Sequence, residues 1–169
     1  MRRRHFIAGT VASGLLAGCS ARQPKFQTYD GPEVTGIIVH KARRRMLLVS
    51  DGRVLRRYKI NLGFAPVGDK KFEGDGKTPE GLYTIDRRNP ESRFHLSLGI
   101  SYPNAEDVAE ARALGKNPGG EIFIHGQKNP FSKKRSTENW TWGCIAVTNR
   151  EIEEIYAMVK DGTPILINP

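Results

Sequence analysis

The sequence predicts a mainly β domain with one or two packed helices. Short apolar runs separated by turn signals fill residues 34–169, and 18 glycines and 10 prolines supply those turns. Only two stretches combine helical spacing with capping signals. A hydrophobic content of 38% over 169 residues is enough for a single domain with a real core, and no internal repeat is visible.

The first strands are expected around a hairpin. Met46–Ser50 and Arg53–Ile60 flank Asp51-Gly52, which suits a type I′ turn because both central residues of that turn need positive φ. The glycine-rich stretch over residues 63–81 has the composition of a loop. Further strands are expected at Leu82–Asp86, Phe94–Ile100, Glu121–His125 and Pro164–Ile167.

Two helices are predicted from their caps. Asn104 can cap a helix over Ala105–Leu114, with Gly115 as its stop. Thr148 and Glu151 have the spacing of a capping box, which predicts the start of the second helix. Apolar residues then follow at helical intervals up to a glycine: Ile152, Ile155, Val159 and Gly162.

The N-terminus has the composition of a targeting segment. Three arginines at positions 2–4 precede an apolar stretch of about a dozen residues, Phe6–Ala17, whereas a membrane span needs roughly 20. Leu16–Cys19 resembles a lipobox, in which the cysteine is lipidated and becomes the mature N-terminus. We expect a lipoprotein signal peptide at 1–18, a lipidated N-terminus and tether at 19–33, and the domain at 34–169.

Export and anchoring follow from the same segment. Its basic start fits a twin-arginine signal, and Sec export fits it nearly as well. An ordinary secretory signal with an incidental cysteine is the alternative to acylation. Ser20 follows Cys19, where an acidic residue would indicate retention in the inner membrane. We therefore expect a lipid anchor on the periplasmic side of the cell envelope, with the outer membrane favoured.

The net charge is positive. It is +9 for the whole chain and +6 without residues 1–18, which carry three arginines and no acidic residue. A basic surface suits an anionic cell-wall polymer or membrane lipid, and an ordinary solvated surface explains it equally well. The export signal argues against nucleic acid as a partner, and Arg43–Arg45 is a single run.

Cys144 is the candidate for chemistry. If Cys19 carries lipid, Cys144 has no partner for an internal disulfide. A thiol becomes a thiolate when a nearby imidazole takes its proton, and the resulting ion pair favours both charges. His125 ends one predicted strand and Cys144 lies in another strand-like segment, so adjacent strand ends would bring them together. Amides around Gly143 and Cys144 could then face a developing oxyanion.

Other roles stay open on spacing alone. A single cysteine is often a small buried apolar residue, and a single histidine is often structural. A zinc site would need three or four ligands, but His40 and His95 are scattered without ligand spacing. No metal site is therefore predicted.

Several motifs resemble one enzyme family. Ile124–Gly126 (IHG) and Thr141–Val147 (TWGCIAV) resemble the catalytic signature of the L,D-transpeptidase (YkuD) family, which is a histidine, a loop and then Ser/Thr-x-Gly-Cys. Residues 74–86 (GDGKTPEGLYTID) match its Thr-Pro-x-Gly segment. Residues 88–104 and 143–155 resemble the YafK-type branch. The resemblance covers roughly residues 34–169 in the right order.

The resemblance implies an L,D-transpeptidase-like β-sandwich with an active-site groove and no cofactor. Cys144 would be the nucleophile and His125 its general base and acid. The Gly126 carbonyl would orient the imidazole, and amides near Gly143 and Cys144 would hold the oxyanion. The donor would be a peptidoglycan stem peptide. Attack on the L-centre carbonyl of diaminopimelate would expel D-alanine and leave a thioester, which an amine resolves in a transpeptidase and water in a hydrolase.

The chain departs from the family pattern next to the nucleophile. Trp142 stands where many members have histidine, and Ala146 and Val147 stand where many have asparagine or arginine. These departures leave three functions open. They are an L,D-transpeptidase, an L,D-carboxypeptidase or amidase that releases a lipoprotein from peptidoglycan, and a non-catalytic cell-wall-binding lipoprotein. The presence of both His125 and Cys144 argues against the third.

Five residues are weaker candidates for substrate binding. Trp140, Thr141 and Trp142 precede the nucleophile closely enough to line the groove, although core packing would explain one of the tryptophans equally well. His95 and Tyr102 lie in the segment that resembles the YafK-type branch, where structural roles are the alternative.

Overall fold

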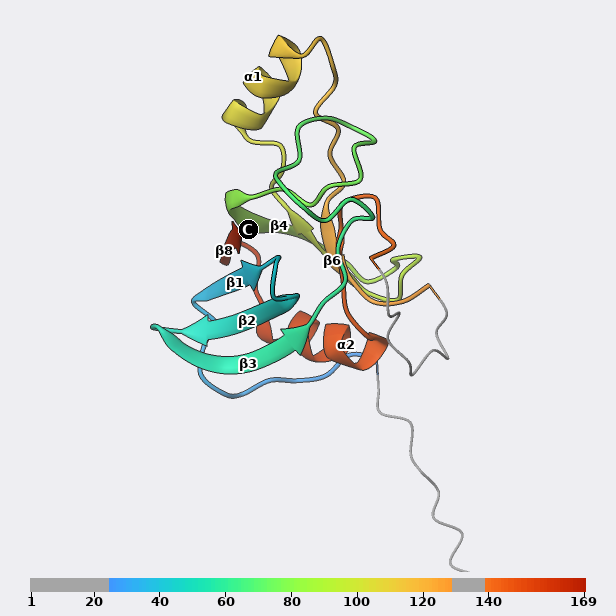
Figure 1. Ribbon diagram of the computed structural model, residues 1–169. Coiled ribbons are helices and arrows are strands. Elements are labelled where there is room, and N and C mark those ends of the chain that lie inside the picture. The colour runs from blue at the N-terminus through green and yellow to red at the C-terminus, as the bar shows by residue number, and fades with distance from the viewer. Residues whose placement is uncertain (1–24, 129–138) are drawn as a thin grey trace, which may run out of the picture.

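The part of the chain that the structure describes forms one curled eight-stranded sheet with two helices (Figure 1). The structure is a computed structural model and describes residues 25–128 and 139–169. The strand order is β3-β2-β1-β8-β4-β5-β6-β7. The bounds are β1 Gly36–His40, β2 Arg45–Ser50, β3 Arg53–Lys59, β4 Gly81–Asn89, β5 Ser97–Ile100, α1 Ala105–Ala113, β6 Phe123–His125, β7 Ile145–Ala146, α2 Asn149–Met158 and β8 Pro164–Asn168.

Strand β4 joins two parts of this sheet. Its first four residues pair with β8, and its residues from Ile85 onward pair with β5. The register shifts between Ile85 and Arg87, and such a bulge bends the strand that carries it. We call β3, β2, β1 and β8 the long-strand half, and β5, β6 and β7 the short-strand half. The predicted mainly β class is confirmed, and the implied sandwich takes the form of one continuous curled sheet.

The hairpin and both helix starts agree with the sequence. Asp51 and Gly52 have φ values of 46° and 80°, as a type I′ turn requires. Thr148 and Glu151 form the expected capping box at the start of α2. Asn104 accepts hydrogen bonds from the first turn of α1, which ends one residue before the predicted boundary.

Two strands begin later than the sequence predicted. Strand β5 starts at Ser97 rather than Phe94, because His95 has a φ of 77° and the Leu96 N–H bonds back to the Phe94 carbonyl. Strand β6 starts at Phe123 rather than Glu121, because Glu121 has a φ of 55°. Positive φ is incompatible with extended backbone, so both strands are shortened by tight local turns.

Helix α2 supports the strands that precede it. Its apolar face contains Ile152 and Ile155, which are fully buried in the hydrophobic core. That core also contains Leu98 of β5 and Ile124 of β6, so the helix packs on the back of the short-strand half. Helix α1 lies at the far end of the molecule from β1–β3 (Figure 1).

Residues 25–33 lie against the domain, although we expected them to belong to a tether. The Phe26 ring packs on Tyr156 of α2, with ring centroids 6.4 Å apart. The Lys25 ammonium donates to the Pro90 carbonyl. The aromatic side chain finds an apolar partner here, which explains why the chain follows the surface. The predicted signal peptide and Cys19 lie outside the described residues.

Candidate active site

Strands β6 and β7 bring His125 and Cys144 to one face of the sheet. The two strands are parallel, and Ile124 pairs with Ile145 while His125 pairs with Ala146. Cys144 directly precedes β7 and therefore lies beside Phe123. Alternate residues of a strand share a face, so the side chains of Phe123, His125 and Cys144 point the same way. The two candidate catalytic residues line one cavity of about 290 Å³, whose other walls come from Asn89, Glu91–Phe94, Ser97, Glu121 and Phe123.

The imidazole of His125 is oriented by the backbone. Its Nδ1 lies 2.7 Å from the Gly126 carbonyl oxygen, as the resemblance implied. A carbonyl can only accept a hydrogen bond, so Nδ1 carries the proton and Nε2 is left for proton transfer. The side chain is 3% exposed, and the rings of Phe94 and Trp140 pack on it at 4.5 and 5.6 Å. Burial lowers the pKa of His125, against the opposite effect of the Gly126 hydrogen bond.

The thiol of Cys144 points to a backbone oxygen. Its Sγ donates to the Glu121 carbonyl oxygen at 3.4 Å. Burial raises the pKa of Cys144, and the Glu121 carboxylate raises it further, while a hydrogen bond from Phe123 and the charge of Lys70 lower it. The sequence suggested a thiolate–imidazolium pair. The structure instead favours a neutral thiol beside a neutral imidazole, because burial penalises both charges.

The residues just before Cys144 form a tight turn. The Thr141 hydroxyl donates to the Cys144 carbonyl at 2.7 Å and accepts from the Gly143 N–H at 3.3 Å. Thr141 therefore fixes the backbone of the nucleophile rather than lining the cavity. Gly143 has a φ of 131°, and a Cβ there would lie 2.7 Å from the Lys77 carbonyl oxygen. Only glycine fits this position.

The glycine-rich loop packs its backbone directly against this turn. A Cβ on Gly63 would lie 2.0 Å from the Gly76 carbonyl oxygen and 3.2 Å from the Gly143 Cα. The Gly63 N–H donates to the buried Thr78 hydroxyl, and the Ala65 N–H donates to the Gly76 carbonyl. Gly63, Gly76 and Thr78 of this loop thus support the turn before the nucleophile, at a distance that a side chain on Gly63 would prevent.

A buried lysine fastens that loop, and sequence reasoning missed it. Lys41 follows β1 and is only 2% exposed. Its ammonium donates to the carbonyls of Gly68 and Thr78, both at 2.7 Å, and pairs with Glu80 at 2.8 Å. Three acceptors satisfy its three N–H groups, which makes burial of the charge tolerable. A lysine next to a strand gives no sign in the sequence that it will be buried.

The loop contains a second buried ion pair that the sequence did not indicate. The Lys70 ammonium lies 2.9 Å from Asp75, and both side chains are nearly inaccessible. Asp75 also accepts from the backbone N–H groups of Lys71, Phe72 and Lys77. These hydrogen bonds keep the pKa of the Asp75 carboxyl below its usual value, although burial acts in the opposite direction. The pair gives the loop a fixed shape beside the cavity.

The two tryptophans have different surroundings. Trp140 is half-buried and packs on His125 and Phe94, so it forms part of the support for the imidazole. Trp142 is 71% exposed and packs edge-on against Phe64 of the loop, with ring centroids 5.0 Å apart. Trp142 and Phe64 together form an exposed aromatic surface next to the nucleophile.

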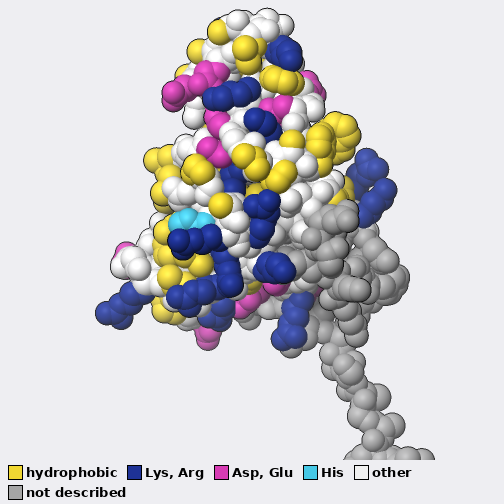
Figure 2. Space-filling view, viewed as in Figure 1, with side chains coloured by type: hydrophobic (Ala, Val, Ile, Leu, Met, Phe, Trp, Pro, Cys, Tyr) yellow, Lys and Arg dark blue, Asp and Glu magenta, His cyan; other side chains and the backbone are white. Residues whose placement is uncertain are grey.

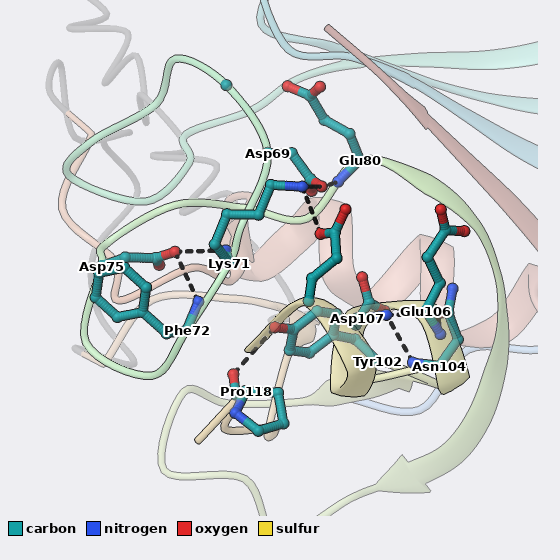
Figure 3. Close-up of polar contacts among 12 residues, drawn as sticks. Asp69, Lys71, Phe72, Asp75, Glu80, Tyr102, Asn104, Glu106, Asp107 and Pro118 are labelled. Atoms are coloured by element: carbon teal, nitrogen blue, oxygen red, sulfur yellow. Dashed lines mark hydrogen bonds and ion pairs between the residues drawn. The ribbon is translucent and has the colours of Figure 1, made fainter. Parts of the chain in front are cut away.

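His95 and Tyr102 lie outside the cavity. The His95 Nε2 is 2.7 Å from Glu153 of α2, which fixes the turn that carries Phe94. The Tyr102 hydroxyl donates to the Pro118 carbonyl at 3.0 Å, within the polar network between the loop and α1 (Figure 3). Their contacts give both residues structural roles, so the prediction that they bind substrate finds no support in the geometry.

The basic side chains gather elsewhere. Figure 2 shows Lys and Arg over the end of the molecule formed by β1–β3. The exposed ones on β3 are Arg53, Arg56, Arg57 and Lys59. Strand β3 ends the sheet order, and charges on such an edge oppose pairing with another strand. The basic side chains on β3 are therefore explained by protection of the sheet edge, without reference to a ligand.

Residues 25–128 and 139–169 form neither a metal-binding cluster nor a membrane-spanning helix. No three His, Cys, Asp or Glu side chains within these ranges are placed to hold a metal ion. No helix there has the length and apolar character to cross a bilayer.

Comparison with known proteins identifies a family that matches most of the chain. A family model described as the L,D-transpeptidase catalytic domain (YkuD) matches residues 35–167. YafK from Escherichia coli strain K12 is 33% identical over 156 residues, which cover 87% of this chain and 57% of YafK. YqjB from Bacillus subtilis strain 168 is 25% identical over 135 residues, which cover 78% and 69%. The chain thus spans little more than half the length of YafK.

Solved structures share the fold. Pgp2 from Campylobacter jejuni, described as a helical cell shape determining protein, has a TM-score of 0.62 and 32% identity, and the match covers 83% of this chain and 49% of Pgp2. An L,D-transpeptidase from Mycobacterium smegmatis has a TM-score of 0.52 and 19% identity, with 79% and 58% covered. On the family model and the identity to YafK, the chain belongs to the L,D-transpeptidase catalytic domain (YkuD) family.

Proposed function

We propose that this chain modifies peptidoglycan by nucleophilic catalysis, with Cys144 attacking a stem peptide. The observation that carries the proposal is that His125 and Cys144 line one cavity from two parallel strands. The tautomer set by the Gly126 carbonyl leaves Nε2 as the base. A binder would have no need of an oriented imidazole beside a thiol.

The reaction begins from neutral groups. Sγ turns from the Glu121 carbonyl and attacks the L-centre carbonyl carbon of diaminopimelate, while its proton passes to Nε2 of His125. The C–N bond to D-alanine then breaks, and the same proton goes to the departing amine. The product is a thioester on Cys144. Proton transfer accompanies attack, because burial disfavours a standing ion pair.

One backbone amide of the tight turn can donate a hydrogen bond to the oxyanion. The Gly143 N–H is engaged with the Thr141 hydroxyl. Of the two amides that the motif suggested, the backbone N–H of Cys144 remains as a donor. It belongs to the same residue as the reacting sulfur. We assign it to the developing charge on the carbonyl oxygen.

An amine or water then resolves the thioester, and one observation favours water. Ala146 and Val147 are fully buried apolar residues, so no polar side chain directly follows the nucleophile to place an acceptor amine. An L,D-carboxypeptidase, or an amidase that releases a lipoprotein from peptidoglycan, is therefore the second candidate. The description of Pgp2 as cell shape determining makes an effect on cell shape part of this proposal.

We place the enzyme at the periplasmic face of the envelope. The support is the sequence of residues 1–19 alone: a basic start, a short apolar stretch and Cys19 in a lipobox-like context. Acylation of Cys19 would hold the domain beside its polymer substrate. A Cys19→Ser protein should then be lost from the membrane fraction, and its full retention there would contradict the anchor.

The test is incubation of the protein with purified muropeptides, followed by mass spectrometry of the products. Crosslinked dimers identify a transpeptidase, and shortened tripeptides identify a carboxypeptidase. Cys144→Ala and His125→Ala should each reduce turnover by more than about a thousandfold, since a catalytic unit loses most of its effect with either member. His40→Ala, at the end of β1, serves as the matched control and should retain activity.

Two outcomes would contradict the proposal. One is the absence of any product that disappears in Cys144→Ala. The other is normal binding of cell-wall material by Cys144→Ala together with no turnover by the unchanged protein, which would identify a non-catalytic wall-binding lipoprotein.

A further inference from the structure

Arg87 of β4 extends across the sheet toward the nucleophile. Its guanidinium carbon lies 4.6 Å from the centre of the Phe123 ring, in cation–π contact. One of its terminal nitrogens is 3.1 Å from the Glu121 carboxylate. Phe123 and Glu121 both line the cavity of Cys144. The charge of Arg87 therefore lies against two residues of the cavity wall.

The local structure is arranged for this crossing. The bulge between Ile85 and Arg87 changes the direction of the Arg87 side chain. Gly99 pairs with Arg87 on one side and with Phe123 on the other. A Cβ on Gly99 would lie 2.5 Å from the Arg87 Cγ and 3.0 Å from its guanidinium carbon. A glycine inside a strand weakens it, so its place here has a packing reason: it leaves the path of the arginine open.

The partners of Arg87 can be exchanged for a ligand. Its pair with Glu121 is open to water, with 40% and 83% of the two side chains exposed. Such exposed pairs contribute little to stability. Its other carboxylate partner, Asp86, contacts a different terminal nitrogen at 3.0 Å. A ligand carboxylate that enters the cavity can therefore replace Glu121 and form paired hydrogen bonds with the planar guanidinium.

The cavity lining carries charges of both signs, and the Glu121 carboxylate already occupies the place at Arg87 that a ligand carboxylate would take. Glu91 and Arg93 lie on the segment before β5, on the other wall. Ala146 and Val147, after the nucleophile, are apolar. On the β4 side of Cys144, Arg87 is the cation whose guanidinium contacts a cavity-lining ring.

We propose that Arg87 is a specificity-determining residue that binds a carboxylate of the donor beside the scissile bond. This inference rests on the proposed function, because it takes the donor to be a stem peptide ending in diaminopimelate and D-alanine. Two carboxylates flank that bond: the D-centre carboxylate of diaminopimelate and the terminal carboxylate of the leaving D-alanine. The shared chemistry is a carboxylate held by a guanidinium.

The experiment compares three donors: the free tetrapeptide, the same peptide amidated at the D-centre, and the same peptide ending in D-alaninamide. Each is tested with the full chain carrying Cys19→Ser and with its Arg87→Met and Arg87→Lys variants. Arg57→Met, on an exposed position of β3, is the matched control. The readouts are kcat and KM for each donor.

Arg87→Met should raise KM for the free donor roughly ten- to hundredfold with little change in kcat, which is the usual effect of losing a charged hydrogen bond. The protein with Arg87 intact should show a higher KM for the donor in which the bound carboxylate is replaced by an amide. The donor with the higher KM therefore identifies which carboxylate Arg87 binds. Arg87→Met should lose that discrimination, and Arg87→Lys should keep part of it. Equal kinetics of the unchanged protein on all three donors, or an equal loss by Arg87→Met on all three, would overturn the proposal.

A second measurement distinguishes failure of the proposed function from failure of the Arg87 proposal. If the unchanged protein converts none of the donors, the function fails, and binding is followed by protection of Cys144 from iodoacetamide. Stronger protection by the free donor than by one amide, lost in Arg87→Met, would still support the role of Arg87. Equal protection by all donors, or none by any, would overturn it.

Discussion

The two halves of the sheet are built by different rules. In the long-strand half, β1 and β8 alternate regularly between buried and more exposed residues. In the short-strand half, all four residues of β5 are buried, and so are both residues of β7. One face there packs on α2 and the other is covered around the cavity. The regular half can be read from local pattern, and the half that holds the thiol depends on contacts between distant segments.

The glycines show the same contrast. Gly52 in the β2–β3 turn has a φ of 80° and open space around it. Gly63 and Gly143 are instead pressed against backbone atoms of other segments. The first kind of glycine serves a turn, and the second kind lets two pieces of backbone touch.

The largest expected effect on stability comes from Lys41, where the long-strand half holds the loop. Lys41→Met would leave the Gly68 and Thr78 carbonyls without their donor and Glu80 without its partner. Loss of one member of a buried pair costs about 3–5 kcal/mol. Urea denaturation should show that decrease in the free energy of unfolding.

Lys160→Met is the matched control for Lys41. Lys160 pairs with Glu33 at 2.8 Å, but the two side chains are 75% and 64% exposed. We expect no measurable change in stability, because water solvates both charges after the substitution. Equal losses of unfolding free energy in the two variants would show that the buried contacts of Lys41 do not stabilise the fold.

The next effect separates the two kinds of glycine. Gly63→Ala would place a Cβ 2.0 Å from the Gly76 carbonyl oxygen, so the loop must move away from the nucleophile. We expect a loss of about 3 kcal/mol in unfolding free energy, together with reduced turnover. Gly52→Ala meets no atom within 4 Å and should cost only about 1 kcal/mol, from its positive φ, with turnover intact. Denaturation and muropeptide turnover should be measured on both variants. A larger loss in Gly52→Ala than in Gly63→Ala would contradict the distinction between the two kinds of glycine.

Local signals in the sequence were enough for the regular elements. The Asp51-Gly52 turn and the caps at Asn104 and Thr148 each depend on residues within a few positions of one another. His125 and Cys144 line one cavity, as expected from two adjacent strand-like segments, while the catalytic roles that the family resemblance gave them stay a prediction. The predictions of the turn and the caps are confirmed because the residues that determine each of them are neighbours in sequence.

The rest depended on contacts that no local pattern encodes. Nothing near Lys41 in the sequence indicates Gly68 and Thr78 as its acceptors, and nothing near Arg87 indicates the open path over Gly99. The extent of burial was also hidden. It raises the pKa of the thiol and lowers the pKa of the imidazole, and both shifts oppose the ion pair that the sequence suggested.

The last prediction concerns that charge state, where the expected change is smallest. Burial and the Glu121 carboxylate raise the pKa of Cys144, so its reaction with iodoacetamide should reach half its maximal rate at a pH above about 8.5, the ordinary thiol value. The folded thiol then keeps its proton where the unfolded thiol loses it. Stability from this group is therefore present below about pH 8.5 and falls as the pH rises further. The full chain carrying Cys19→Ser leaves one thiol to follow.

Three variants sharpen the thiol measurement. Glu121→Gln removes a charge that opposes the thiolate, so the midpoint of alkylation should fall. Glu91→Gln also changes a carboxylate that lines the cavity, and we expect it to shift the midpoint less, because Glu121 is the carboxylate that raises the pKa of the thiol. His125→Ala should leave the midpoint unchanged or lower, because it removes no positive charge and admits water. A midpoint below 8.5 in the unchanged protein that rises in His125→Ala would instead establish a resting ion pair. Turnover should be lost in His125→Ala in either case, because Nε2 is needed when the thiol attacks.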